Sequence, residues 1–247
     1  PKILVLGGTT EASQLAQRLA AAGLPATLSY AGRVARPKPQ PVPMHVGGFG
    51  GVEGLAEHLT REGITHVVDA THPFAVQMSA NAVAACAVTD VPLVALTRLA
   101  WRPEPGDNWQ RVPDIPAAVA ALDGPPRSVM LAIGRMHLDA FAAQPQHRYL
   151  LRFVDPPKVP PPLPNHHVIV DRGPFTVAGD NALMRAHGVD LIVSKNAGGS
   201  GADAKLSAAR ALGLPVLMID RPPLADRPEV HSVDEVLHWL HGTDRGV

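Results

Sequence analysis

The sequence predicts an α/β fold with two similar domains, each built on a parallel sheet. Three observations predict it: short apolar runs alternate with helical patterns, the alternation repeats in the second half, and each half opens on a strand-like run that ends in glycine. Alternation of this kind is typical of parallel strands joined by right-handed helical crossovers. The length of 247 residues is enough for two such domains.

The first half opens on the apolar run Ile3-Leu4-Val5-Leu6, which leads into a glycine turn and then an alanine- and leucine-rich helical pattern. Further apolar runs bounded by Gly and Pro predict strands, and apolar residues at helical spacing between them predict helices. The expected strands are 3–6, 26–30, 44–46, 66–70 and 93–97, and the expected helices are 11–22, 52–61 and 75–87.

The second half repeats this pattern from 129–134, which resembles the opening strand and turn. The closing parts match best, because VPLVALTR at 91–98 and LPVLMIDR at 214–221 both place proline six residues before arginine. We therefore expect domains at 1–124 and 125–247, with convergence on a common α/β pattern as the alternative to a true repeat. Further strands are expected at 149–153, 168–170, 191–194 and 216–219, a helix from about 137, and a short strand followed by a helix within 111–122 and within 229–240.

The composition excludes several classes of protein. The formal net charge is zero, which argues against nucleic acid or an anionic membrane as a partner. The single cysteine, Cys86, excludes an internal disulfide framework, and no apolar run reaches membrane-spanning length. No signal-peptide pattern opens the sequence, so we expect a soluble cytoplasmic protein. The histidine pairs 166–167 and 238/241 are poor evidence for metal, and none is expected.

The basic residues are mostly arginine, 17 against five lysines, and many fall in expected loops. Arginine matches the geometry of carboxylate and phosphate groups. This bias favours an anionic ligand, although solvated loop ends and surface ion pairs would also explain single arginines.

The string LGGTTEA at 6–12 has the form of a phosphate-binding turn. A turn between a strand and a helix presents backbone N–H groups and the positive end of the helix, and Gly7 and Gly8 would let a phosphate approach closely. Thr9 or Thr10 could cap the helix. Proteins that choose NAD usually carry an acid at the end of the second strand, but 27–33 contains none, and its Ser29 and Arg33 suit a 2′-phosphate. A nucleotide bound here should therefore be NADP(H), unless Arg33 is simply a surface residue.

Other polar and glycine-rich turns follow the expected strands. DATHPFA at 69–75 brings His72 to a strand end, where it could donate to a ligand, although Asp69 could equally be a helix cap and His72 an ordinary loop histidine. Similar turns occur at 47–51, 171–175 and 194–205. Open α/β sheets bind ligands at the carboxyl ends of their strands, so several such turns imply a lined cleft between two sheets.

Six strings together resemble one family, the precorrin-6A reductases, which are NADPH-dependent enzymes of cobalamin biosynthesis. They are LGGTTEA (6–12), SYAGR (29–33), GGFGG (47–51), DATHPFA (69–75), DRGPF (171–175) and KNAGG (195–199). They occur in the expected order over most of the chain, and DATHPFA and KNAGG carry most of the specificity.

The resemblance implies two Rossmann-like domains whose parallel sheets face a shared cleft holding NADPH and the substrate. It implies an oxidoreductase reaction: hydride transfer from NADPH to a double bond of the tetrapyrrole precorrin-6A, giving precorrin-6B. The many carboxylates of that macrocycle would explain loop arginines on a protein of zero net charge. We expect a monomer or weak oligomer with no nucleic-acid or membrane partner.

Residue by residue, the resemblance gives two sets of expected contacts, with His72 as the candidate catalytic residue and no metal ligand. The cofactor-binding set is Gly7, Gly8, Thr9, Thr10, Glu11, Ser29, Tyr30, Arg33, Gly48, Thr71 and His72, and the substrate-binding set is Arg98, Arg135, Arg172, Lys195, Asn196, Gly198 and Arg221.

Two alternatives remain open at this point. Two facing α/β domains also suit a glycosyltransferase that uses nucleotide sugars. A two-lobed NADP-binding regulator without catalytic activity would carry the same cofactor turn.

Overall fold

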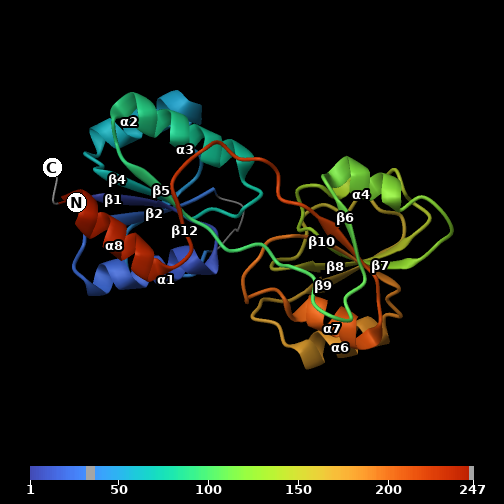
Figure 1. The fold of residues 1–247 in the computed structure, drawn as a ribbon. Helices are drawn as coiled ribbons and strands as arrows, with labels where there is room; N and C mark the ends of the chain where they lie inside the picture. Colours follow the sequence, from blue (N-terminus) through green and yellow to red (C-terminus); the bar gives the residue numbers. More distant parts are fainter. Residues whose placement is uncertain (32–36, 245–247) are drawn as a thin grey trace. The chain divides into compact units, whose positions relative to one another are not determined.

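The computed structural model describes residues 1–31 and 37–244, and it divides the chain into two compact units. The first unit comprises Pro1–Leu99 together with the chain from Pro223 onward, and the second comprises Ala100–Pro222 (Figure 1). Each unit holds a six-stranded sheet in which every pairing is parallel. The expectation of two α/β units with Rossmann-like parallel sheets is confirmed. The shared cleft stays a prediction, because each unit is described by itself.

The sheet of the first unit has the order β12-β5-β4-β1-β2-β3. Its strands are β1 (Ile3–Leu6), β2 (Ala26–Tyr30), β3 (Met44–Val46), β4 (His66–Asp69), β5 (Leu93–Leu96) and β12 (Glu229–Val230). The helices of this unit are α1 (Thr10–Ala21), α2 (Gly51–Arg61), α3 (Val76–Thr89) and α8 (Val233–Asp244).

The side chains of β1 alternate between the two faces of this sheet. Ile3 and Val5 pack with α1 and α8, whereas Leu4 and Leu6 pack with α2 and α3. All four side chains are buried, which explains why this strand is an unbroken apolar run rather than an alternating one. The central strand thus ends in the middle of the sheet, where the glycine turn follows.

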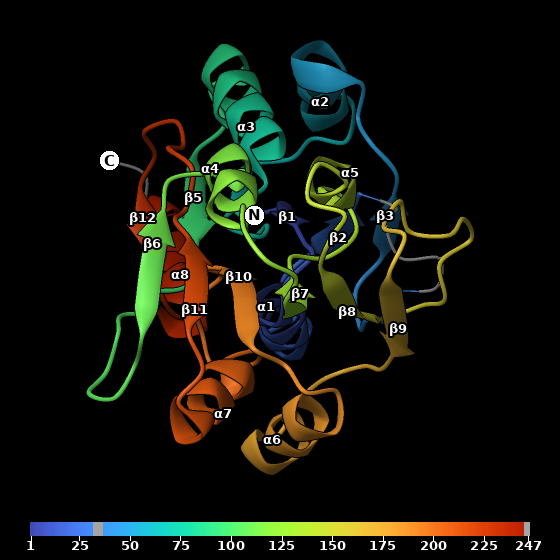
Figure 2. The same cartoon turned by 90° about the vertical axis from the view of Figure 1, so that its right-hand side faces the viewer.

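The sheet of the second unit has the order β6-β11-β10-β7-β8-β9. Its strands are β6 (Trp109–Val112), β7 (Ser128–Ala132), β8 (Arg148–Phe153), β9 (His166–Val170), β10 (Leu191–Lys195) and β11 (Val216–Ile219). The helices are α4 (Ile115–Ala121), α5 (Leu138–Phe141), α6 (Val177–Ala186) and α7 (Ala204–Leu212). Figure 2 shows α6 and α7 on one face of this sheet and α4 and α5 on the other.

Each unit completes its sheet with an edge strand from the other half of the sequence. After β5 the chain passes into the second unit, where β6 pairs with β11, and after β11 it returns, so that β12 pairs with β5. The ladders are regular: Ala95 N–H donates to Pro228 O at 2.8 Å, and Val216 N–H donates to Asn108 O at 2.9 Å.

Because of these two pairings, the boundary between the units differs from the one expected at 124/125. The structure divides the chain at 99/100 and again at 222/223, so 100–124 belongs to the second unit and the chain from 223 belongs to the first. Hydrophobic periodicity identifies a strand but not the strand with which it pairs. Here β6 and β12 each pair with a strand from the other half of the sequence.

The predicted elements are otherwise confirmed within one or two residues at most ends, although the helix expected near 137 has only four residues, Leu138–Phe141. Among the described residues, no helix is long and apolar enough to cross a membrane.

Candidate functional site

The turn after β1 lies directly against the end of β2. Gly7 N–H donates to Ser29 O at 2.8 Å, and a Cβ atom on Gly7 would come within 2.8 Å of Leu28 Cδ1. Gly8 has φ +124°, with no atom within 4 Å of the place that a Cβ would take. The turn therefore needs glycine twice, once for close packing and once for a backbone conformation that other residues rarely adopt.

Thr9 connects this turn to the loop after β4. Its hydroxyl accepts from Ala12 N–H at 3.2 Å as the N-cap of α1, and it donates to Ala70 O at 2.8 Å. The expected cap is thus confirmed for Thr9, while Thr10 is the first residue of α1. The first turn of a helix leaves backbone N–H groups without intrahelical acceptors, so this end of α1 can receive an anion.

Glu11 and Arg98, expected in different binding sets, form an ion pair. Arg98 Nε donates to Glu11 Oε2 at 2.8 Å, and the two side chains are only 14% and 27% exposed. A carboxylate in the first turn of α1 would repel an anionic ligand, and the guanidinium of Arg98 offsets that charge.

Asp69 anchors the loop after β4. Its Oδ1 accepts from the N–H and the hydroxyl of Thr71 at 3.1 and 2.7 Å, and its Oδ2 accepts from Ser79 Oγ at 2.7 Å. Arg227 Nη1 completes the set with a short ion pair to the same Oδ2, and both side chains are buried. Asp69 is therefore a structural anchor of Thr71 rather than the cap of α3, whose N-cap position is Ala75.

His72 is half-buried in the same loop. Its Nδ1 accepts from Phe74 N–H at 3.2 Å, and its ring lies 5.7 Å from that of Phe74 between centroids. An imidazole whose Nδ1 accepts a hydrogen bond carries its proton on Nε2, so the neutral ring is a donor at Nε2.

The remaining cofactor candidates lie at the ends of β2 and β3. Ser29 is buried, while Tyr30 is half-buried and its carbonyl accepts from Gly47 N–H at 2.8 Å. Gly48 is exposed in the loop that leads to α2. Arg33, the residue expected to select the 2′-phosphate, lies outside the described residues.

In the second unit, two of the expected substrate residues hold the loop after β10. The amide of Asn196 is buried and pairs with the backbone of Trp101, accepting from its N–H at 2.8 Å and donating to its carbonyl at 3.0 Å. Arg221 donates from Nε to Asn196 O at 3.0 Å and from Nη2 to Ala197 O at 3.1 Å. Lys195 ends β10, and Gly198 follows in the left-handed region with φ +68°.

Two further expected arginines converge on Asp155, at the start of the proline-rich segment 155–164. Arg135 donates to the carbonyl of Asp155 and lies 4.8 Å over the ring of Phe153. Arg172 Nη2 lies 3.9 Å from the Asp155 carboxylate. The structure thus brings Arg135 and Arg172 together around one acidic residue.

Sequence reasoning left four buried or stacked residues out of the binding sets. Arg227 was missed because its partner is 158 positions away. Arg152 pairs with Asp180 through both guanidinium nitrogens at 2.6 and 3.4 Å and stacks 3.6 Å over Phe175. Trp101 and Lys205 lie at the glycine loop, and the only available signal was the position of Lys205 just beyond KNAGG.

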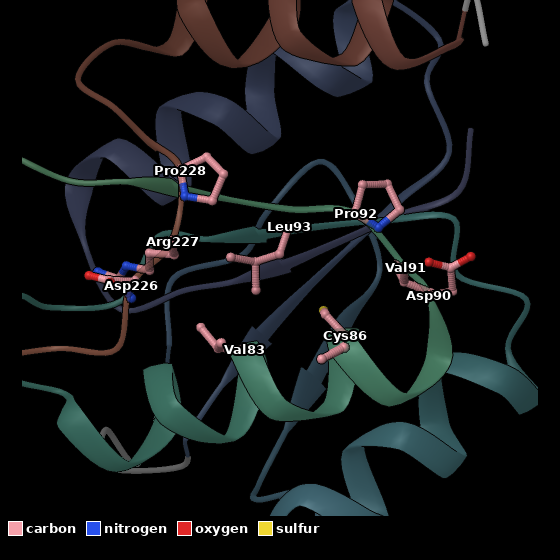
Figure 3. A pocket seen from close by; sticks show the side chains of 10 residues that line it. Val83, Cys86, Asp90, Val91, Pro92, Leu93, Asp226, Arg227 and Pro228 are labelled. Atoms are coloured by element: carbon pink, nitrogen blue, oxygen red, sulfur yellow. The ribbon is translucent and has the colours of Figure 1, made fainter. Parts of the chain in front are cut away.

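A hollow of about 360 Å³ lies elsewhere in the first unit, where Val83 and Cys86 of α3 face Leu93 (Figure 3). None of the expected cofactor or substrate residues lines it. Burial, with a smaller contribution from Asp69, raises the pKa of the Cys86 thiol to about 12, so the thiol is an unreactive packing group. Within 1–31 and 37–244, no three His, Cys, Asp or Glu residues gather as metal ligands would.

Comparisons with known proteins agree over the whole chain. Residues 2–241 match the family model described as precorrin-6x reductase CbiJ/CobK. A precorrin-6A reductase from Rhodobacter capsulatus is 58% identical over 100% of this chain and 99% of its own. A cobalt-precorrin-6A reductase from Priestia megaterium is 31% identical over 96% of this chain and 97% of its own. A solved structure of CobK precorrin-6A reductase matches with a TM-score of 0.95 at 57% identity, covering 100% of this chain and 97% of that one.

Proposed function

The chain belongs to the precorrin-6x reductase CbiJ/CobK family, and we propose that it uses NADPH to reduce one double bond of precorrin-6A, giving precorrin-6B in cobalamin biosynthesis. Family membership makes it an oxidoreductase that acts on precorrin-6A with a nicotinamide cofactor. The choice of NADPH and the role of each residue are the proposal. The observation that carries it is the glycine turn after β1. This turn packs so closely against β2 that position 7 has room for no residue larger than glycine.

The turn and α1 suit the pyrophosphate of a dinucleotide. The backbone at Gly8 is open to approach, since nothing lies within 4 Å of the Cβ position there. The first N–H groups of α1 face the same turn, and the Glu11–Arg98 pair removes the charge that would oppose a phosphate. Gly7, Gly8, Thr9 and Thr10 hold the pyrophosphate in this proposal, and Glu11 supports them through Arg98.

Selection of NADPH over NADH depends on the end of β2. An acid there would repel a 2′-phosphate, and 27–31 contains none. The side chain of Ser29 is buried, so the main discrimination falls to Arg33, with Tyr30 and Gly48 bordering the adenosine end.

Bound NADPH supplies the hydride, and the protein orients both reactants and controls a proton. Thr71 and His72 border the nicotinamide ribose in this proposal, fixed by Asp69. Reduction of a C=C bond adds a hydride and a proton, so the reaction consumes one NADPH and one proton per double bond. His72 is the candidate donor: it would act as the imidazolium, whose loss of a proton restores the neutral ring that accepts from Phe74 N–H.

The second unit supplies most contacts to the carboxylates of the macrocycle. Lys195, Arg135 and Arg172 are the cationic candidates, and Gly198 offers its backbone N–H. Asn196, Arg221 and Arg98 use their side chains on other protein groups, so we assign them to support of the binding surface.

The experiment is a turnover assay with purified protein, in which loss of the NADPH absorbance is followed with and without precorrin-6A. Oxidation that requires the macrocycle and yields precorrin-6B is expected. Oxidation of NADH at an equal rate would contradict the cofactor assignment. Binding of NADPH without turnover would favour the regulator, and hydrolysis of nucleotide sugars would favour the glycosyltransferase.

A parallel assay with cobalt-precorrin-6A tests whether the substrate carries metal. We expect the cobalt-free macrocycle to be preferred, because the relatives that act on it are up to 58% identical, against 31% for the cobalt-precorrin-6A reductase of Priestia megaterium.

A further inference from the structure

The loop after β10, residues 196–202, is held by its carbonyl groups. Arg221 donates to the carbonyls of Asn196 and Ala197, Trp101 Nε1 donates to Gly199 O at 2.7 Å, and Lys205 Nζ donates to Ala202 O at 2.5 Å. Four carbonyls of one short loop therefore accept hydrogen bonds from side chains of the second unit.

The direction of these carbonyls fixes the direction of the intervening N–H groups. In a planar trans peptide the N–H points opposite to the C=O of the same unit. The N–H groups of Gly198, Ser200 and Asp203 follow the carbonyls of 197, 199 and 202, so they point away from the donors. These three N–H groups thus face away from the side chains that hold the loop, and in the proposed function they can receive a substrate carboxylate.

Lys205 and Trp101 contact each other as well as this loop. The ammonium of Lys205 lies 4.8 Å from the centre of the Trp101 ring, and the residue is only 6% exposed. The backbone of Trp101 is in turn held by the Asn196 amide. A change in either side chain would release carbonyls at 199 or 202 while leaving the contacts at 196 and 197.

We propose that Lys205 and Trp101 are positioning residues for substrate binding, which hold the 196–202 loop so that its N–H groups receive a carboxylate of the tetrapyrrole. The inference rests on the proposed function. Neither residue contacts the substrate, since both act through the backbone of the loop.

Burial of Lys205 is costly, which argues that its role is not stability alone. Desolvation, the largest cause, and the nearby Arg152 lower its pKa, Asp180 and Asp203 act in the opposite sense, and the net result is a pKa of about 8. These groups come from β8, from α6 and from the residue before α7, and the Trp101 ring lies beside the ammonium. Met is close to Lys in length and removes the charge whose desolvation is costly. Lys205→Met should therefore fold.

The test compares Lys205→Met and Trp101→Phe with the wild type and with Arg185→Met, an exposed cation on α6. The Kd for precorrin-6A is measured by absorbance titration without cofactor, the Kd for NADPH by fluorescence, and folding by thermal unfolding. Both variants should weaken precorrin-6A binding about tenfold, as expected for loss of a held hydrogen-bonding loop, with NADPH affinity and Tm close to wild type. Arg185→Met should change none of the three quantities.

Unchanged precorrin-6A affinity in Lys205→Met would overturn the inference, as would equal losses for both ligands. If Lys205→Met fails to fold, Trp101→Phe decides alone, because it keeps an aromatic ring beside Lys205 and removes the indole donor to Gly199. A wild-type protein that neither binds nor reduces precorrin-6A would instead overturn the proposed function.

The pH dependence gives a second readout. Because burial lowers the pKa of Lys205 to about 8, we expect the ammonium to lose its proton near that pH and the wild-type affinity for precorrin-6A to fall above it. Lys205→Met should lack this fall. An identical profile in the two proteins would contradict the positioning role.

Discussion

Arg227 forms a buried ion pair with Asp69, although 158 residues separate them in the sequence. Asp69 ends β4 and orients Thr71, while Arg227 lies in the segment by which the chain returns to the first unit. The loop that carries His72 is therefore held by a segment that follows the whole second unit in the sequence.

Arg227→Met should destabilise the first unit by about 3–5 kcal/mol, because it leaves the Asp69 carboxylate buried without its cation. Urea unfolding measures the loss. The double variant Asp69→Asn/Arg227→Met should recover part of it, since the neutral amide needs no counter-charge. A single variant within about 1 kcal/mol of wild type would show that the pair adds no more than an exposed one.

Gly7→Ala should sharply reduce NADPH affinity, because its Cβ would meet Leu28 Cδ1 at 2.8 Å and Ser29 O at 3.0 Å. The turn must shift, and with it the N–H groups proposed for the pyrophosphate. Gly23→Ala is the matched control: Gly23 has φ +65° but no atom within 4 Å of its Cβ position, so we expect about 1 kcal/mol of lost stability and unchanged NADPH affinity. Equal NADPH affinity in Gly7→Ala and wild type would remove this turn from the cofactor site.

Arg33→Glu should raise the KM for NADPH at least about tenfold and leave that for NADH nearly unchanged, since only NADPH carries the 2′-phosphate. Arg18→Glu is the control for charge reversal, because Arg18 is exposed on α1 and pairs there with Asp234. An equal rise for both cofactors would refute the role of Arg33.

Lys195→Ala should weaken binding of precorrin-6A and spare binding of NADPH, because Lys195 ends a strand of the second unit. Separate titrations with the two ligands decide the point. A fall in NADPH affinity alone would mean that the ligands are assigned to the wrong units.

Cys86 should resist thiol reagents in the folded protein at pH 8, because its pKa is raised to about 12 and the thiolate is the reactive form. Labelling followed by mass spectrometry is unambiguous, since the chain has one cysteine. The expected result is slow labelling in buffer and rapid labelling in urea. Rapid labelling in buffer would mean that α3 opens readily.

The sequence predicted the strands and the turns that follow them because both depend on local patterns. The run Ile3–Leu6 is apolar because it is buried on both faces, and the glycines after it are required by local packing and by φ. Family strings then placed Thr71 and Lys195 at strand ends, where the structure has them.

Contacts between distant residues could not be predicted in this way. Nothing near Asp69 indicates Arg227, and nothing near Asn196 indicates that its amide pairs with the backbone of Trp101. Arg98 likewise looks available in the sequence, but Glu11 of α1 pairs with it. These contacts join residues far apart in the sequence, so local patterns do not reveal them.

Because β6 pairs within the second unit and β12 pairs within the first, the second unit is a continuous insertion within the first and runs from Ala100 to Pro222. On the ribosome, the second unit can complete its sheet as soon as its own residues emerge. The sheet of the first unit keeps an open edge at β5 until Glu229–Val230 is synthesised, so the unit that carries the proposed cofactor turn is completed after the unit that carries the proposed macrocycle contacts.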